Sequence, residues 1–170
     1  MKGKKGVIIL GSARGDGNTR KIVNMIRANH KNLHFINLCE KKIGYFDYEF
    51  RNQDDDFIPL MSEILEYEVL IFATPVYWYS MSGILKNFFD RITDLLEIRK
   101  DLGRRLNGKT MMSISCGSNA EILDSFSIPF SETAKYLKMN YWGHTHTWIN
   151  AGKIPVEVEL QLEKFLIKLR

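Results

Sequence analysis

Short apolar runs alternate along the 170-residue chain with longer segments in which apolar residues recur every three or four positions. The first run, Gly6–Gly11, is apolar throughout and bounded by glycines, which is typical of a strand buried on both faces. Four later runs have the same character. The predicted strands are 6–11, 33–38, 69–74, 109–116 and 141–149.

The segments between these runs have the period of amphipathic helices. The predicted helices are 18–30, 58–67, 82–96, 120–139 and 155–169. Asn18 or Thr19 is suited to cap the first of them and Ser82 the third, because short polar side chains accept hydrogen bonds from the free N–H groups of a first turn. Pro129 is expected to break or kink the fourth, since proline has no backbone N–H to donate.

Strands that alternate with helices and are apolar throughout predict a parallel sheet covered by helices on both faces. No repeat or composition shift marks a second domain, so residues 1–170 are expected to form one doubly wound α/β domain with a five-stranded sheet. In such sheets, ligands bind beyond the carboxyl ends of the strands, where the winding direction reverses. The loops after the first, third and fourth strands are therefore the candidate binding loops.

The composition, with 45% hydrophobic and 26% charged residues, is that of a folded domain. No apolar run approaches the ~20 residues needed to cross a bilayer, and the apolar stretch after Met1–Gly6 is too short for a signal peptide. Cys39 and Cys116 are too few for a disulfide framework. These features predict a cytoplasmic protein without a membrane partner.

The net charge of +4 is unevenly distributed, because residues 1–31 hold eight basic side chains and one acidic one. An anionic ligand is therefore expected near that segment. A nucleic acid partner is not expected, because Lys2, Lys4 and Lys5 are not interleaved with aromatic residues.

The loop Gly11–Thr19 lies between a predicted buried strand and a predicted helix, and its chemistry suits a phosphate group. Glycines let backbone N–H groups turn inward, while hydroxyl groups and the positive end of the helix add further donors. The loop lacks the Gly-Lys-Ser/Thr ending of a Walker A motif and the Gly-x-Gly-x-x-Gly spacing of a dinucleotide site. The alternative is a glycine-rich turn with a helix cap.

The loop Thr74–Gly83 contains three adjacent aromatic residues, Tyr77, Trp78 and Tyr79, just beyond another predicted strand. This pattern suits a flat, partly apolar ligand. A subunit interface or a core cluster would explain the same pattern, and the residues alone do not choose among the three.

Three segments together resemble a known family. These are Gly11-Ser12-x-Arg14-x-x-Gly17-Asn18-Thr19, Asp55-Asp56-Phe57, and Thr74-Pro75-Val76-Tyr77-Trp78 followed by Ser82-Gly83-x-Leu85-Lys86-x-Phe88-x-Asp90-Arg91. They resemble the NAD(P)H-dependent FMN reductase family of flavodoxin-like proteins, close to its iron–sulfur flavoprotein branch. The resemblance covers residues 5–118.

The resemblance implies a flavodoxin-like strand order 2-1-3-4-5, non-covalent FMN, NAD(P)H as co-substrate, and a homodimer or homotetramer. It also implies an enzyme that passes electrons through FMN to a small acceptor such as a quinone or free flavin, with no protein nucleophile. Ser12, Arg14, Gly17, Asn18 and Thr19 would hold the FMN phosphate. Pro75, Val76, Tyr77 and Trp78 would border the isoalloxazine ring, and Cys116, Gly117 and Ser118 would form the third flavin-contacting loop.

The chain departs from the iron–sulfur branch in the segment 43–50, which holds no cysteine. Cys39 alone cannot bind a cubane cluster, which needs about four thiolates. We therefore expect no iron–sulfur centre, and the aromatic residues of this segment would instead cover the flavin or a subunit contact.

Two further features keep alternatives open. His144 and His146 lie two apart on a predicted strand and so share a face, as a metal site or, in the favoured interpretation, as a partly exposed pair without metal. Cys116 is interpreted as a small core residue, with a redox role left open.

Two other functions compete with the enzyme. One is a flavodoxin-like electron carrier without its own nicotinamide oxidation, although such carriers tend to be acidic. The other is a regulatory or binding domain without flavin.

Overall fold

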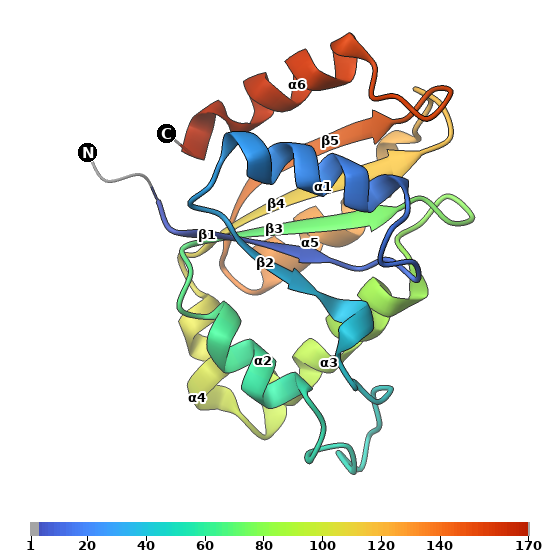
Figure 1. Ribbon diagram of the computed structural model, residues 1–170. Coiled ribbons are helices and arrows are strands. Elements are labelled where there is room, and N and C mark those ends of the chain that lie inside the picture. The colour runs from blue at the N-terminus through green and yellow to red at the C-terminus, as the bar shows by residue number, and fades with distance from the viewer. Residues whose placement is uncertain (1–3, 170) are drawn as a thin grey trace.

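The computed structural model describes residues 4–169, and Lys2 lies outside them. Five parallel strands form one sheet in the order β2-β1-β3-β4-β5 (Figure 1). The strands are β1 (Gly6–Leu10), β2 (His34–Asn37), β3 (Val69–Pro75), β4 (Thr110–Gly117) and β5 (Asn140–Trp148). The expected α/β class and the strand order 2-1-3-4-5 are both confirmed.

Helices cover both faces of the sheet (Figure 1). One face carries α1 (Asn18–Asn29) and α6 (Val156–Leu166), and the other carries α2 (Phe57–Ile64), α3 (Gly83–Glu97) and α5 (Ile128–Tyr136). A short helix, α4 (Lys100–Gly103), follows α3. Single 3-10 turns are formed by Leu38–Glu40, Arg104–Leu106, Asp124–Ser127 and Ile167–Leu169.

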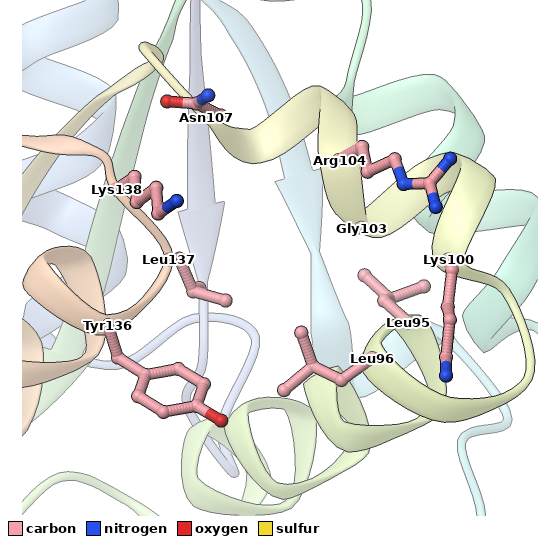
Figure 2. Close-up of a pocket in the computed structure, with 9 residues that line it drawn as sticks. All are labelled: Leu95, Leu96, Lys100, Gly103, Arg104, Asn107, Tyr136, Leu137 and Lys138. Atoms are coloured by element: carbon pink, nitrogen blue, oxygen red, sulfur yellow. The ribbon is translucent and has the colours of Figure 1, made fainter.

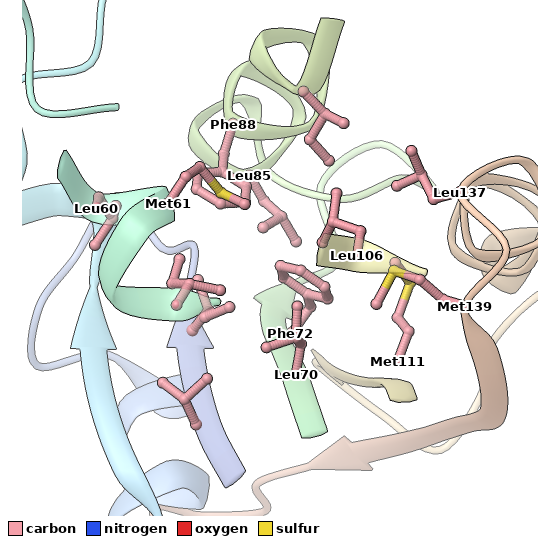
Figure 3. Close-up of a cluster of buried hydrophobic side chains, with 14 of the residues drawn as sticks. Leu60, Met61, Leu70, Phe72, Leu85, Phe88, Leu106, Met111, Leu137 and Met139 are labelled. Carbon is pink, nitrogen blue, oxygen red and sulfur yellow. The ribbon is translucent and has the colours of Figure 1, made fainter. Parts of the chain in front are cut away.

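The central strand β1 supplies both halves of the core, since all five of its residues are buried. Side chains alternate along a strand, so Val7 and Ile9 pack toward α2 and α3 while Ile8 and Leu10 pack toward α1 and α6. Burial of each such side chain stabilises the fold by about 1.5–3 kcal/mol. Figure 3 shows the cluster on the α2–α3 side, where Phe72 and Leu70 of β3 meet Leu85 and Phe88 of α3.

Three local predictions need correction. Gly17, rather than Asn18 or Thr19, is the N-cap of α1, and no side chain of the described residues caps that helix. Pro129 does not interrupt a helix over 120–139; it lies in the first turn of α5, where its missing N–H costs nothing. The segment 100–106, which had no predicted structure, forms α4 and a 3-10 turn. The cap at Ser82 is confirmed, because its side chain accepts a hydrogen bond from Leu85 N.

The edge strand β5 is irregular. Its pairing with β4 shifts between Met111 and Ser113, so Trp142 and Gly143 together oppose one residue of β4. Gly143 has a φ of +108°, a backbone conformation that would be strained for a residue with a side chain. Such a bulge reverses the alternation of faces, and it therefore places Tyr141 on the same face as His144.

Candidate functional site

The predicted binding loops meet beyond the carboxyl ends of β1, β3 and β4, on one edge of the sheet (Figure 1). Ser82 joins the first two of them. Its hydroxyl donates to the carbonyl oxygen of Gly11 at 2.7 Å, and its backbone N–H donates to the hydroxyl oxygen of Thr74 at 3.0 Å. The residue that begins α3 therefore also fixes the start of the glycine-rich loop.

Gly11 is required by this close approach. A Cβ atom at this position would lie 2.6 Å from Cβ of Leu85 and 3.1 Å from its Cα atom. Both atoms belong to the rigid first turn of α3, so any side chain would push the helix away from β1. Gly11 thus sets the distance between the loop after β1 and the loop after β3.

The first loop has free donors for an anion. The first turn of α1 has no side-chain cap and no acidic residue, so its N–H groups and the positive end of the helix face the loop. Ser12 is buried and its hydroxyl oxygen accepts a hydrogen bond from Arg14 N at 3.4 Å. Arg14 itself is exposed and adds a full positive charge. These groups together can hold a phosphate.

The loop after β3 presents its aromatic residues on a tight turn. Tyr77 and Ser80 exchange backbone hydrogen bonds of 2.9 and 3.0 Å, and the two residues between them have positive φ values, +48° for Trp78 and +63° for Tyr79. Such turns favour Asn-Gly, because a side chain in this conformation costs roughly 1–2 kcal/mol. The turn leaves 94% of the Trp78 side chain exposed.

A cavity of about 420 Å³ lies between this turn and the loop that follows β4. Val76, Trp78 and Tyr79 border it on one side, and Gly117 and Ser118 border it on the other. The two sides are joined where Val76 N donates to the carbonyl oxygen of Cys116 at 3.0 Å. Ile122 and Leu123 add apolar surface, so the cavity suits a flat molecule with a polar edge.

A second cavity, of about 340 Å³, has no part in this site. Figure 2 shows it between Leu95 of α3 and Leu137, with Lys100, Arg104 and Lys138 around it. It lies near the amino ends of β4 and β5, away from the loops just described.

The side chain of Cys116 does not line the 420 Å³ cavity. Its thiol is buried in the core cluster beneath α1 and α6, within hydrogen-bonding reach of Thr147 and Thr19. Burial raises the pKa of this thiol, which keeps it protonated and a weak nucleophile. The structure therefore places Cys116 as the small core residue of the first interpretation.

Arg91 is a residue whose role sequence reasoning missed. Its side chain is 1% exposed, stacks on the ring of Phe57, and pairs with Asp55 and Asp94. Its guanidinium also donates to the carbonyl oxygens of Gly44 and Asn52, each at 3.0 Å. This network ties the aromatic segment 43–56 to α3. The only sequence signal was that Asp55 and Arg91 both belong to the resemblance motifs.

Asn37 was also missed. It ends β2 beside the first loop, is 4% exposed, and its side-chain carbonyl oxygen has no hydrogen-bond partner in the described chain. Nothing in the local pattern of 33–38 distinguished it.

His144 and His146 share a face, as predicted, but their partners are serines. His146 is buried, so the prediction of partial exposure holds only for His144. Among residues 4–169, no group of three or more His, Cys, Asp or Glu side chains could hold a metal ion.

Comparison with known proteins decides what this site belongs to. The model of the NADPH-dependent FMN reductase family matches residues 5–145. The chain belongs to this family. It is therefore an NAD(P)H-dependent flavin oxidoreductase of an FMN-binding family, as the sequence motifs implied.

Individual relatives agree with the family. A putative NAD(P)H-dependent FMN-containing oxidoreductase, YwqN of Bacillus subtilis, is 28% identical over 146 residues, which cover 81% of each chain. The structure titled Trp repressor binding protein from Bacillus subtilis has a TM-score of 0.70 and 24% identity, covering 98% of this chain and 96% of that one. General stress protein 14 from Treponema denticola, solved with FMN, has a TM-score of 0.64 and 19% identity, covering 97% of both chains.

The residues of this FMN reductase fit the cofactor of its family. The uncapped first turn of α1, with Ser12 and Arg14 beside it, suits a phosphate dianion. The cavity between Val76 and Gly117 suits a flat ring. None of the helices among the described residues is long and apolar enough to cross a membrane.

Proposed function

We propose that the protein passes electrons from NAD(P)H through FMN to a small acceptor such as a quinone or free flavin. The observation that carries this proposal is the open 420 Å³ cavity with the exposed indole of Trp78 at its border. An exposed aromatic face beside a flat cofactor can stack on a second flat molecule, which suits aromatic acceptors better than extended or charged ones.

In this proposal the twelve residues named from the family resemblance divide into three groups. Ser12, Arg14, Gly17, Asn18 and Thr19 hold the phosphate with backbone N–H groups, one hydroxyl and one positive charge. Of Pro75, Val76, Tyr77 and Trp78, Val76 and Trp78 border one side of the ring cavity, and Pro75 and Tyr77 flank Val76 in the chain without lining it. Cys116, Gly117 and Ser118 shape the other, with Cys116 acting through its backbone carbonyl.

The chemistry of hydride acceptance and release belongs to FMN when it is bound. The task of this chain is to hold the phosphate, to orient the ring between Val76 and Gly117, and to leave one face accessible beside Trp78. No side chain acts as a nucleophile in this scheme.

Anaerobic reduction tests the proposal. The protein reconstituted with FMN is mixed with NADH or NADPH, the loss of flavin absorbance is followed, and quinones, free flavins and azo compounds are then offered as acceptors. Rapid bleaching followed by reoxidation with quinone or flavin supports the proposal. Bleaching only by a separate reductase would show an electron carrier instead, and a protein that cannot take up FMN would refute the proposed site.

We also propose that the protein is a homodimer or homotetramer. Exposed aromatic side chains in the segment after β2 support this, since Tyr45 and Tyr48 are each more than four-fifths exposed. Light scattering after size exclusion measures the mass, and a monomer at all protein concentrations would contradict the proposal.

A further inference from the structure

Strands β4 and β5 are joined by a row of polar side chains on the face that packs toward α5. We call it the histidine–serine row; in order it contains Tyr141, Ser113, His144, Ser115 and His146. Successive members are 2.9, 3.0, 3.0 and 2.7 Å apart. The row ends where Nε2 of His146 lies 3.0 Å from the backbone carbonyl oxygen of Asn119.

The last contact determines where every proton in the row lies. A carbonyl oxygen only accepts, so Nε2 of His146 must carry the hydrogen. In a neutral imidazole the other nitrogen, Nδ1, then accepts, and Ser115 must donate its single hydroxyl proton to it. Ser115 has no second proton, so it accepts from Nε2 of His144.

The same reasoning continues to the other end. Nδ1 of neutral His144 accepts from the hydroxyl of Ser113, and Ser113 in turn accepts from the hydroxyl of Tyr141. All five hydrogen bonds therefore point in one direction, from Tyr141 to Asn119. A reversal at any member would bring two lone pairs or two hydrogens together at the next.

The surroundings of the row keep both imidazoles neutral. Burial, followed by the proximity of His146, lowers the pKa of His144 to about 4, and burial also lowers the pKa of His146. The ring of Phe126 lies 5.2 Å from that of His144, and the ring of Trp148 lies 6.2 Å from that of His146, centroid to centroid, so each imidazole has an apolar neighbour. Burial raises the pKa of Tyr141, so this residue also keeps its proton at neutral pH.

The end of the row lies at the cavity. The 420 Å³ cavity is bordered by Gly117, Ser118 and Asn119. The carbonyl oxygen of Asn119 accepts the hydrogen bond from His146. Gly117 packs directly on the imidazole, since a Cβ atom there would lie 2.8 Å from Cε1 of His146. The imidazole therefore contacts the cavity-lining segment 117–119 at two points.

We propose that His146 is a positioning residue that holds the cavity-lining segment 117–119 in place through Asn119, and that the one-directional histidine–serine row keeps its N–H aimed at that carbonyl. The hydrogen bonds of the row are present in the fold without any cofactor. Its role in cofactor binding rests on the proposed function, because it requires FMN to occupy the cavity beside this segment.

Nitrogen NMR of the cofactor-free protein tests the direction of the row. Long-range proton–nitrogen spectra distinguish a protonated ring nitrogen from one with a lone pair, and the variants His30→Gln and His34→Gln assign the two surface histidines by the loss of their signals. At neutral pH, both interior imidazoles are expected to carry hydrogen on Nε2 alone. A hydrogen on Nδ1 of either residue would overturn the proposal.

Two variants of His146 test the positioning role. His146→Gln retains a side-chain N–H that can reach the Asn119 carbonyl, whereas His146→Phe retains the flat shape without a donor. Amide hydrogen exchange at Glu121, whose backbone N–H donates to the side-chain oxygen of Asn119 at 3.1 Å, is expected to accelerate about fivefold in the Phe variant, as for the loss of one hydrogen bond, and by less than half as much in the Gln variant. Ser115→Ala, which cuts the row one step earlier, is expected to accelerate it as well.

A control and a second readout separate the possible failures. Thr145→Val removes a hydroxyl on the opposite face of β5, which accepts from Gln161, and it is expected to leave exchange at the Glu121 amide unchanged. The FMN dissociation constant is expected to rise about fivefold for His146→Phe and less for His146→Gln. Equal exchange in wild type and His146→Phe would refute the positioning role. If exchange responds but neither the wild type nor any variant binds FMN, the proposed function fails while the contact of His146 with the segment 117–119 stands.

Discussion

Two aromatic segments follow strands of the same sheet, yet the fold treats them in opposite ways. The segment 43–56 is anchored from below by buried Arg91, which reaches two of its backbone carbonyl groups and Asp55. Within residues 4–169, the backbone of the turn 77–80 has only its own two hydrogen bonds, and the turn holds Trp78 and Tyr79 in a strained conformation. Aromatic composition alone therefore does not define a site. Hydrogen bonds from buried Arg91 stabilise the segment 43–56, whereas the turn 77–80 has a strained backbone that exposes its rings.

The anchor of the first segment should give the largest effect. Replacement of Arg91 by alanine leaves buried Asp94 and half-buried Asp55 without their partner, so we expect a loss of about 3–5 kcal/mol in the free energy of unfolding. Urea denaturation measures it. Lys86→Ala, which removes an exposed pair with Asp90, serves as the control and should cost less than about 1 kcal/mol. Similar losses in the two variants would mean that Arg91 is not an anchor.

On acidification, the contribution of His144 to the free energy of unfolding should be lost at a higher pH than the contribution of the Arg91–Asp55 pair. The pKa of His144 is about 4 in the fold and 6.5 in an unfolded chain, so the unfolded state binds more protons between these values. The free energy of unfolding should therefore fall as the pH drops from about 6.5 to about 4. Denaturation at a series of pH values measures this slope, and His144→Phe should flatten it.

The anchor responds only to stronger acid. Burial by itself would raise the pKa of Asp55, but the hydrogen bonds from Arg91 and from the backbone of Phe57 and Gly44 lower it overall, below 3.8. Its contribution is present above that value and lost below it. A wild-type slope confined to pH below 4 would contradict the role given to His144.

Ser82 connects the end of the loop that contains the turn 77–80 to Thr74 of β3 and to Gly11 after β1. Ser82→Ala removes the cap of α3 and the hydrogen bond to Gly11, and we expect a loss of about 1–2 kcal/mol together with weaker FMN binding. Thermal unfolding and flavin titration measure the two effects. Ser131→Ala removes an exposed hydroxyl that bonds only within α5 and should change neither.

Relief of strain in the turn itself should have the smallest effect, and the opposite sign. Replacing Trp78 by Asn and Tyr79 by Gly gives a pair that accepts positive φ. The free energy of unfolding should therefore rise by about 1 kcal/mol, and the melting temperature should rise with it. Turnover with aromatic acceptors should fall, because the exposed indole is lost. Phe50→Gly tests the same relief in the anchored segment, where φ is +52°, and should leave turnover unchanged.

Much of the fold could be predicted because its signals are local. The five apolar runs correspond to the five strands within one or two residues, since strands buried on both faces must be apolar throughout. Ser82 was recognised as a cap from its own side chain and position. Pro129 was misjudged because the helix boundary, which decides whether proline breaks or begins a helix, depends on the packing of Phe126 and Phe130 beneath it.

The site was predictable only in part. The loops were placed by the rule for parallel sheets and by the family motifs. The direction of the Cys116 thiol was not, because one residue of register decides which face of the sheet it joins. One partner of Arg91, the carbonyl oxygen of Gly44, lies 47 residues away, beyond any pattern along the chain.

By itself, the sequence determined the five strands, the helices between them and the family, because hydrophobic period and contiguous motifs are written in neighbouring residues. The tertiary structure alone decided which polar groups meet: the anchor at Arg91, the cavity between Val76 and Gly117, and the histidine–serine row. The row also needed the bulge at Gly143 to bring Tyr141 onto the face of His144. Hydrogen bonds act over about 3 Å, so their partners exist only once distant strands lie side by side.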